Sequence, residues 1–172
     1  DRARCDASQT ITPAELATYS RQLLLPEVGL RGQATLRSGK VLVVGTGGLG
    51  SPVLLYLAAA GVGNLGIVEF DTIESSNLHR QVLFGHQQIG QPKAQAAAAR
   101  LAAFPGLATS THELRLDAGN AESIVGGYDL VVDATDNFAA RYAINDACVA
   151  TSRPNVSASI LRFEGQVSVF QP

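Results

Sequence analysis

The sequence predicts an α/β fold with a Rossmann-like, mostly parallel sheet flanked by helices, and a helical segment at the N-terminus. Short apolar runs alternate with longer helical patterns, which is the arrangement that a parallel sheet with helical crossovers requires. A glycine-rich turn at residues 45–50 joins the first of these runs to a helix. With 172 residues, 46% of them hydrophobic, the chain is long enough for one domain with its own core.

The first elements are expected to lie outside the sheet. Residues 1–11 form a polar leader with no apolar stretch of the kind found in signal peptides. Thr12 and Glu15 match a capping box, which predicts a helix that begins at Thr12 and that Pro26 terminates. A second, short helix is expected over residues 33–37.

The alternating part of the chain follows directly. The first strand is short and rich in valine, which is typical of a strand buried on both faces, whereas the last one alternates apolar and polar residues. Strands are expected over residues 40–44, 66–70, 110–116, 128–133, 155–159 and 162–170. Helices are expected over residues 51–60, 89–104, 120–125 and 138–150.

Composition and charge exclude several classes of function. The net charge of -2 gives no basic field that would attract nucleic acid or an anionic membrane. No run of about 18 apolar residues is present that could span a bilayer. Cys5 and Cys148 show neither a CxxC pair nor metal-ligand spacing, so we expect no structural disulfide and a cytoplasmic location.

The glycine-rich turn carries the first functional signal. Gly45, Gly47 and Gly50 form a G-x-G-x-x-G motif, with Gly48 as an additional glycine, between a strand and a helix. Such a turn brings backbone N–H groups close to a phosphate at the helix N-terminus. Glu69 ends the next expected strand, where an acid can accept hydrogen bonds from ribose hydroxyls. These features do not distinguish NAD, FAD or ATP, and the glycines alone could also serve a tight strand–helix junction.

A second group of polar residues favours a triphosphate. Asn77 and Arg80 follow the second expected strand, Lys93 opens a helix, and Asp136 follows the fourth strand. Arg80 can bind phosphate oxygens in a bidentate manner, Lys93 supplies a point charge, and Asp136 is a suitable ligand for a largely hydrated magnesium ion. ATP carries about four negative charges, more than the roughly two of a dinucleotide pyrophosphate, and therefore needs such a set of cations.

Each of these residues also has a simpler interpretation. Arg80 could be an ordinary surface arginine, and Asp136 with Asn137 could only cap the helix that follows. Asp71 could line a metal site or merely turn the chain. The three histidines show no ligand spacing and are interpreted as solvated or structural; they are His79, His86 and His112.

Six ordered motifs resemble the MoeB/ThiF group, bacterial relatives of the ubiquitin-activating enzymes. They are YSRQ (19–22), GTGGLG (45–50), AGVGNLGIVEFD (60–71), SNLHRQ (76–81), GQPK (90–93) and DATDN (133–137), and FEGQVSVF (163–170) is similar as well. The resemblance extends over residues 12–172. It implies an ATP-binding adenylation domain over these residues, incomplete at its C-terminus, because members of the group usually continue with two CxxC pairs that bind zinc.

The resemblance also implies roles for individual residues. The glycine loop would lie under the nucleotide, and Glu69 stands where the group usually has a ribose-binding aspartate. Asp136 matches the magnesium-linked aspartate, and Arg21 matches an arginine that enters the partner's site across a homodimer. The phosphate-binding positions are matched by Asn77, Arg80 and Lys93.

The implied reaction is ATP-dependent adenylation of the C-terminal glycine carboxylate of a ubiquitin-like sulfur-carrier protein of the MoaD/ThiS type, which ends in Gly-Gly, with release of pyrophosphate. Two alternatives stay open. A nicotinamide-dependent oxidoreductase would use the glycine loop and Glu69 but would leave Arg80, Lys93 and Asp136 without a role. A catalytically inactive scaffold partner of an activating enzyme would be expected to lose the phosphate and metal ligands that this chain retains.

Overall fold

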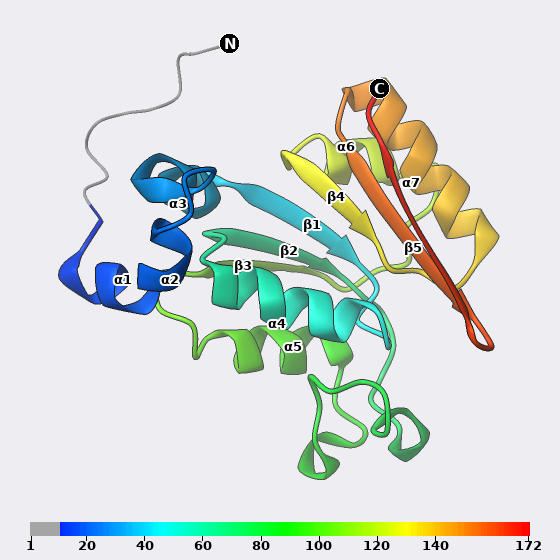
Figure 1. Ribbon diagram of the computed structural model, residues 1–172. Helices are drawn as coiled ribbons and strands as arrows, with labels where there is room; N and C mark the ends of the chain where they lie inside the picture. Colours follow the sequence, from blue (N-terminus) through cyan, green and yellow to red (C-terminus); the bar gives the residue numbers. More distant parts are fainter. Residues whose placement is uncertain (1–10) are drawn as a thin grey trace.

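The computed structural model describes residues 11–172, so the expected polar leader, Ile11 excepted, and Cys5 lie outside the described residues. One six-stranded sheet forms the centre, in the order β3-β2-β1-β4-β5-β6 (Figure 1). The first five strands in this order pair in parallel, and β5 with β6 forms an antiparallel hairpin. The predicted mostly parallel α/β fold is therefore confirmed.

The sheet divides at β1. From this strand the chain continues to β2 and β3 on one side, and later to β4, β5 and β6 on the other. In open parallel sheets, ligands bind beyond the carboxyl ends of the strands at such a switch point. The strands are β1 (Lys40–Val44), β2 (Asn64–Val68), β3 (Ala108–His112), β4 (Leu130–Asp133), β5 (Asn155–Leu161) and β6 (Glu164–Phe170).

Four helices cover the two faces of the sheet. α4 (Gly50–Ala60) and α5 (Lys93–Leu101) lie on one face, and α6 (Ala121–Val125) and α7 (Phe138–Thr151) lie on the other (Figure 1). Two 3-10 helices, η1 (Ser75–Asn77) and η2 (His86–Gln88), lie between β2 and α5. None of the helices within residues 11–172 combines the length and the apolar character needed to cross a membrane.

The alternation of side chains along β1 produces two hydrophobic cores. Val43 packs with Leu54 of α4 and Leu101 of α5 on one face. Leu42 and Val44 point the other way, into the cluster that α6 and α7 complete. Both faces of the central strand are thus buried, as its β-branched sequence predicts.

The N-terminal helices dock at the end of α4. The capping box at α1 (Pro13–Thr18) is confirmed, since Thr12 Oγ1 accepts a hydrogen bond from the Glu15 N–H at 3.2 Å. The helix expected to continue to Pro26 is interrupted at Tyr19, and the next turn is α2 (Ser20–Leu23). Gln22 Nε2 donates to the Ala60 carbonyl at 2.9 Å, which ties α2 to the last turn of α4.

Several element boundaries differ from the predicted ones. The second helix is α3 (Gly29–Ser38), longer than residues 33–37. Strands β2 and β3 begin and end earlier than residues 66–70 and 110–116. Their pairing ends at Val68 and His112, just before Glu69, whose carboxylate accepts from the Thr46 N–H of the glycine loop. α5 is shorter than residues 89–104, since η2 and Gly90, with φ +85, precede it.

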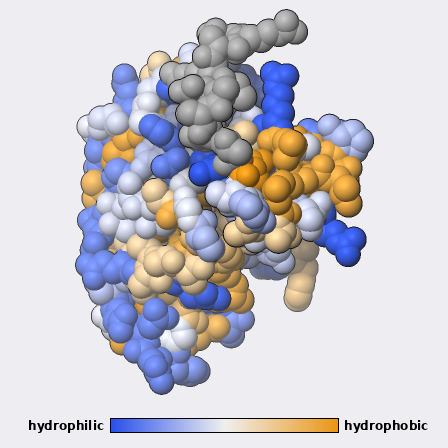
Figure 2. All heavy atoms as spheres, turned by 90° about the vertical axis from the view of Figure 1, so that its left-hand side faces the viewer, coloured by the Kyte–Doolittle hydropathy of each residue, from blue (hydrophilic) through white to orange (hydrophobic). Residues whose placement is uncertain are grey.

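The side of the molecule with the N-terminal helices exposes several leucines. Figure 2 faces this side and shows apolar side chains at the surface beside polar ones. Leu24 is 76% exposed and Leu30 is 60% exposed, so neither belongs to the core of this chain. Arg21 lies in α2, one turn before Leu24, and is exposed too.

Candidate functional site

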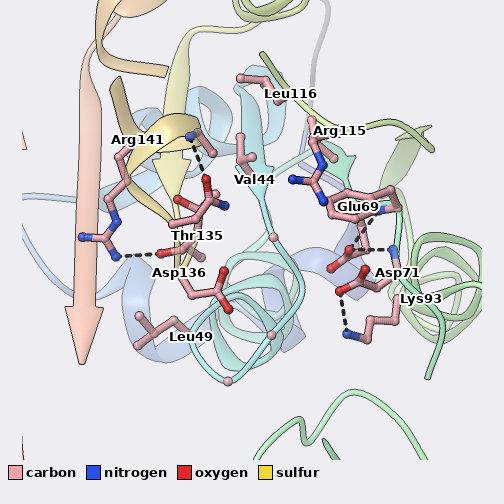
Figure 3. A pocket seen from close by; sticks show the side chains of 18 of the residues that line it. Val44, Leu49, Glu69, Asp71, Lys93, Arg115, Leu116, Thr135, Asp136 and Arg141 are labelled. Carbon is pink, nitrogen blue, oxygen red and sulfur yellow. Dashed lines mark hydrogen bonds and ion pairs between the residues drawn. The ribbon is translucent and has the colours of Figure 1, made fainter. Parts of the chain in front are cut away.

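A cavity of about 530 Å³ opens at the carboxyl ends of β1, β2 and β4, at the switch point of the sheet (Figure 3). Its volume falls within the range of about 300–1,000 Å³ that is usual for small-molecule sites. The glycine loop forms one wall, with Gly45, Gly47 and Gly48 among the lining residues. The remaining walls come from the segments that follow β2, β3 and β4 and from the end of β5.

Two glycines of the loop are required by its geometry. Gly45 has φ +92, and a Cβ there would lie 2.9 Å from the Ala134 carbonyl oxygen. A Cβ on Gly50 would lie 1.9 Å from the Gly45 carbonyl oxygen. The loop can therefore turn this tightly from β1 into α4 only without side chains at these two positions.

The loop presents donors to the cavity. Within residues 11–172, the backbone N–H groups of Gly47, Gly48 and Leu49 donate to no protein acceptor. They lie at the N-terminus of α4, where the helix dipole places partial positive charge. Free N–H groups and a helix N-terminus together form a site for an anion such as phosphate.

Glu69 holds this loop in place. Its carboxylate accepts hydrogen bonds from Thr46 N at 3.0 Å, Thr46 Oγ1 at 2.7 Å, Phe70 N at 2.8 Å and Asp71 N at 3.0 Å. Burial raises the pKa of Glu69, but these hydrogen bonds outweigh burial and bring the pKa below its ordinary value. The carboxylate is thus ionised and already bonded to four donors of the chain itself, and its contact with a ribose stays a prediction.

Two of the predicted cations line the cavity. Lys93, at the start of α5, is only 6% exposed, and its Nζ lies 3.5 Å from Asp71 Oδ2. The stem of Arg80 packs over Gly48, since a Cβ there would lie 3.6 Å from Arg80 Cδ. Arg80 Nη1 donates to the Ser76 carbonyl at 3.0 Å, which leaves the rest of its guanidinium toward the cavity.

Asp136 reaches the cavity from the loop between β4 and α7 (Figure 3). Asp133, just before it, is buried and accepts hydrogen bonds from Thr135 Oγ1 at 2.6 Å and Ser157 Oγ at 2.9 Å. Asn137 caps α7 by accepting from Ala140 N at 2.9 Å. The capping role therefore belongs to Asn137, and the carboxylate of Asp136 is left for the cavity.

The donor set fits a hydrated magnesium ion. Residues 11–172 contain no group of three or more His, Cys, Asp or Glu side chains that could hold a metal by themselves. Mg²⁺ commonly binds through one or two carboxylates, with waters and phosphate oxygens as its other ligands. Asp136 could supply such a carboxylate.

Three predicted residues do not line the cavity. Gly50 serves the turn described above. Asn77 is 9% exposed, and its Oδ1 accepts from the Glu74 N–H at 3.4 Å within the η1 turn. Arg21 lies on α2, outside the residues that line the cavity. Of the histidines, His112 hydrogen-bonds to Tyr128 Oη at 2.8 Å, in agreement with a structural role.

Two arginines that the sequence did not single out also line the cavity. The guanidinium of Arg115 stacks 4.6 Å above the Phe70 ring, beyond the end of β3. Arg141 lies in the first turn of α7. For Arg141, the available sequence signal was a cation in the first turn of a helix, the same signal that Lys93 gives.

A family model described as the ThiF family matches residues 19–172. MoeZ of Mycobacterium tuberculosis, a probable adenylyltransferase/sulfurtransferase, is 50% identical over 96% of this chain and 42% of its own length. The sulfur carrier protein adenylyltransferase of Thermus thermophilus is 52% identical over 92% of this chain and 59% of its own length. The crystal structure of E. coli MccB with ATP is similar with a TM-score of 0.83 and 27% identity, over 90% of this chain and 49% of that chain. The chain thus spans about half the length of these relatives.

Proposed function

Because this chain belongs to the ThiF family, we propose that it binds ATP with magnesium and adenylates the C-terminal glycine carboxylate of a ubiquitin-like sulfur-carrier protein of the MoaD/ThiS type. One observation carries the proposal. The free N–H groups of the glycine loop, Arg80, Lys93 and Asp136 surround a single cavity. This set suits a metal-bound polyphosphate, and the names of the MoeZ and Thermus relatives agree with adenylyl transfer.

The proposed reaction needs little covalent chemistry from the protein. An oxygen of the carboxylate forms a bond to the α-phosphorus of ATP, the bond from that phosphorus to the bridging oxygen breaks, and pyrophosphate leaves with the electron pair. A carboxylate is already ionised at neutral pH, so no general base is required. The remaining work is alignment of the two substrates and stabilisation of the developing charge.

The residues of the cavity divide this work. The glycine loop and Arg80 would hold phosphate oxygens, and Lys93 would add a charge that burial strengthens. Asp136 would bind magnesium, which neutralises phosphate charge when present. Glu69 would act on the nucleotide through the loop that it holds.

A homodimer with Arg21 acting in the partner's site forms part of the proposal. Arg21 is exposed at a distance from its own cavity, and the exposed Leu24 and Leu30 lie on the same segment. Such leucines beside an arginine suit an interface between copies of the chain. Light scattering after size exclusion should give twice the monomer mass of 18.0 kDa. A monomer at all concentrations up to about 100 μM would contradict this arrangement, since a stable dimer holds at micromolar concentrations.

ATP–pyrophosphate exchange tests the function and identifies the carrier. Purified carriers that end in Gly-Gly are added to the chain with Mg·ATP, and each is paired with a version that lacks the last glycine. Exchange should require both magnesium and the intact tail of one carrier. Absence of exchange with every carrier, together with tighter binding of NADH than of Mg·ATP in calorimetry, would favour the oxidoreductase alternative instead.

A further inference from the structure

Arg141 carries a charge that the phosphate end of the cavity does not account for. It lies in the first turn of α7 and lines the cavity together with Ser159 and Ile160 of β5. Figure 3 shows it on the side formed by the β4–α7 loop, across the cavity from Lys93. Two separate positive groups therefore face one cavity from opposite walls.

The contacts of Arg141 orient its guanidinium without neutralising it. Nη2 donates to the Thr135 carbonyl at 2.6 Å and to the Ala158 carbonyl at 3.2 Å. No carboxylate within residues 11–172 lies within 4.0 Å of this guanidinium, and in the same residues Nε and Nη1 donate to no acceptor. One edge of the group is fixed by neutral carbonyls, and donors on the other nitrogens remain available.

The position of Arg141 opposes the helix dipole, and a bound anion would offset this cost. A cation in the N-terminal turn of a helix opposes the helix dipole. Lys93 is placed in the same way in α5, but it has Asp71 as an ion-pair partner. Within the described residues Arg141 has no such partner, so the missing negative charge is expected from a ligand.

The chemistry of the site indicates which ligand this is. The function proposed above assigns the phosphate oxygens to the loop N–H groups, Arg80 and Lys93, which lie on the other walls. The planar fork of a guanidinium matches the two oxygens of a carboxylate. Resting on the function proposed above, we propose that Arg141 binds the carboxylate of the incoming protein tail, before that carboxylate attacks the α-phosphorus.

This contact would serve the reaction in two ways. It would lower the repulsion between the carboxylate and the triphosphate, which otherwise keeps two anions apart. It would also hold the carboxylate at a fixed place relative to the loop that carries Asp136, because Nη2 of Arg141 donates to the Thr135 carbonyl in that loop. The same bond changes as in the proposed reaction then follow, with pyrophosphate as the leaving group.

Two peptides with the same Gly-Gly ending, one with a free C-terminal carboxylate and one with a C-terminal amide, test the contact. Calorimetry measures their binding to the chain in the presence of magnesium and a non-hydrolysable ATP analogue. The native chain should prefer the free carboxylate by at least about tenfold, the size expected for a charge-assisted pair. In Arg141→Gln this preference should fall to about twofold or less, while the amide binds as before.

Arg153→Gln is the matched control. Arg153 also donates to a carbonyl, that of Gly126 at 3.5 Å, and its Nη1 lies 4.0 Å from Asp129 Oδ1, but it does not line the cavity. This variant should keep the preference for the free carboxylate. Both variants should melt near the native temperature and bind Mg·ATP with native affinity.

Each other outcome overturns the inference. An equal loss of affinity for both peptides in Arg141→Gln would assign the residue a structural role. A weaker affinity for Mg·ATP would make it either a phosphate ligand or a support of the loop that carries Asp136, and both refute a role confined to the carboxylate. No preference for the free carboxylate in the native chain, or no binding of that peptide, would also refute the contact. Pyrophosphate exchange with an intact carrier distinguishes the role of Arg141 from the adenylation function. If exchange occurs but Arg141 proves to have no role in it, only the inference about Arg141 is refuted.

Discussion

Replacement of Glu69 by glutamine should destabilise the chain by about 3 kcal/mol. The carboxylate accepts two hydrogen bonds from Thr46 and two from the N–H groups of Phe70 and Asp71. A glutamine has one oxygen, so its NH₂ group must face either the N–H groups of Phe70 and Asp71 or Thr46, whose hydroxyl can turn to accept. At least one N–H donor then loses its acceptor, and the other hydrogen bonds lose a charged partner. Hydrogen bonds to a charged group contribute about 1.5–3 kcal/mol each, against about 0.5–1.5 kcal/mol for neutral ones, so the total loss is about 3 kcal/mol.

The effect of this substitution should depend on pH. Hydrogen bonds bring the pKa of Glu69 below its ordinary value of 4.5 in spite of burial. A lowered pKa in the folded state means that the stabilisation is complete above pH 4.5 and is lost as the pH falls through the lowered pKa. The difference in the free energy of unfolding between the native chain and Glu69→Gln should therefore be largest at neutral pH and should become smaller in acid.

Urea unfolding followed by circular dichroism measures both claims. The free energy of unfolding is compared at pH 7 and at pH 4 for the native chain, Glu69→Gln and the control Glu113→Gln. Glu113 is exposed and, among residues 11–172, bonds only to Gln95, so the free energy of unfolding of its variant should stay within about 0.5 kcal/mol of native. The reasoning would be refuted if Glu69→Gln lowered the free energy of unfolding by less than about 1 kcal/mol at pH 7. It would also be refuted if the difference from the native chain did not become smaller in acid.

Four further predictions concern single positions. Lys93→Gln should weaken Mg·ATP binding at least about tenfold in calorimetry, because a buried charge is removed from the cavity; an unchanged affinity would exclude Lys93 as a phosphate ligand. Gly50→Ala should lower the free energy of unfolding in urea by about 3 kcal/mol or more, since the new Cβ would lie 1.9 Å from the Gly45 carbonyl oxygen. A variant as stable as the native chain would show that the loop can relax. Burial raises the pKa of the Cys148 thiol to about 11, so iodoacetamide should not modify it at about pH 8 until a denaturant is added. Mass spectrometry measures the modification, and rapid alkylation of the native chain would contradict the prediction. Arg21→Ala should leave the dimer intact but lower pyrophosphate exchange at least about a hundredfold, and near-normal exchange would rule out a role in the partner's site.

Elements of the fold could be predicted from the sequence where a local pattern is compatible with few structures. β1 and the turn into α4 were predicted because a short apolar run followed by G-x-G-x-x-G allows few other structures. The end of β2 was placed two residues too late. That boundary depends on Glu69 turning back to Thr46, a contact across 23 residues that no local pattern carries.

The candidate site could be predicted only in part, for a related reason. Arg80, Lys93 and Asp136 meet because the carboxyl ends of parallel strands share one edge of the sheet. Asn77 was expected beside them, but its side chain is used by its own turn. Arg141 was missed because its guanidinium is oriented by the carbonyls of Thr135 and Ala158, and the second of these lies 17 residues further along the chain.

The pairing of β1 with β4 has a consequence for how the chain reaches its native state. The backbone N–H of Lys40 bonds to the side chain of Asp129, which lies 89 residues later in the sequence. During synthesis on a ribosome, one edge of β1 must therefore wait for β4 to emerge, while β2 and β3 are already available. Closing such a long loop is slow. Nascent chains that stop before β4 should thus leave β1 open to mispairing, and nucleotide could not rescue them because the cavity wall formed by residues 134–160 would not yet exist.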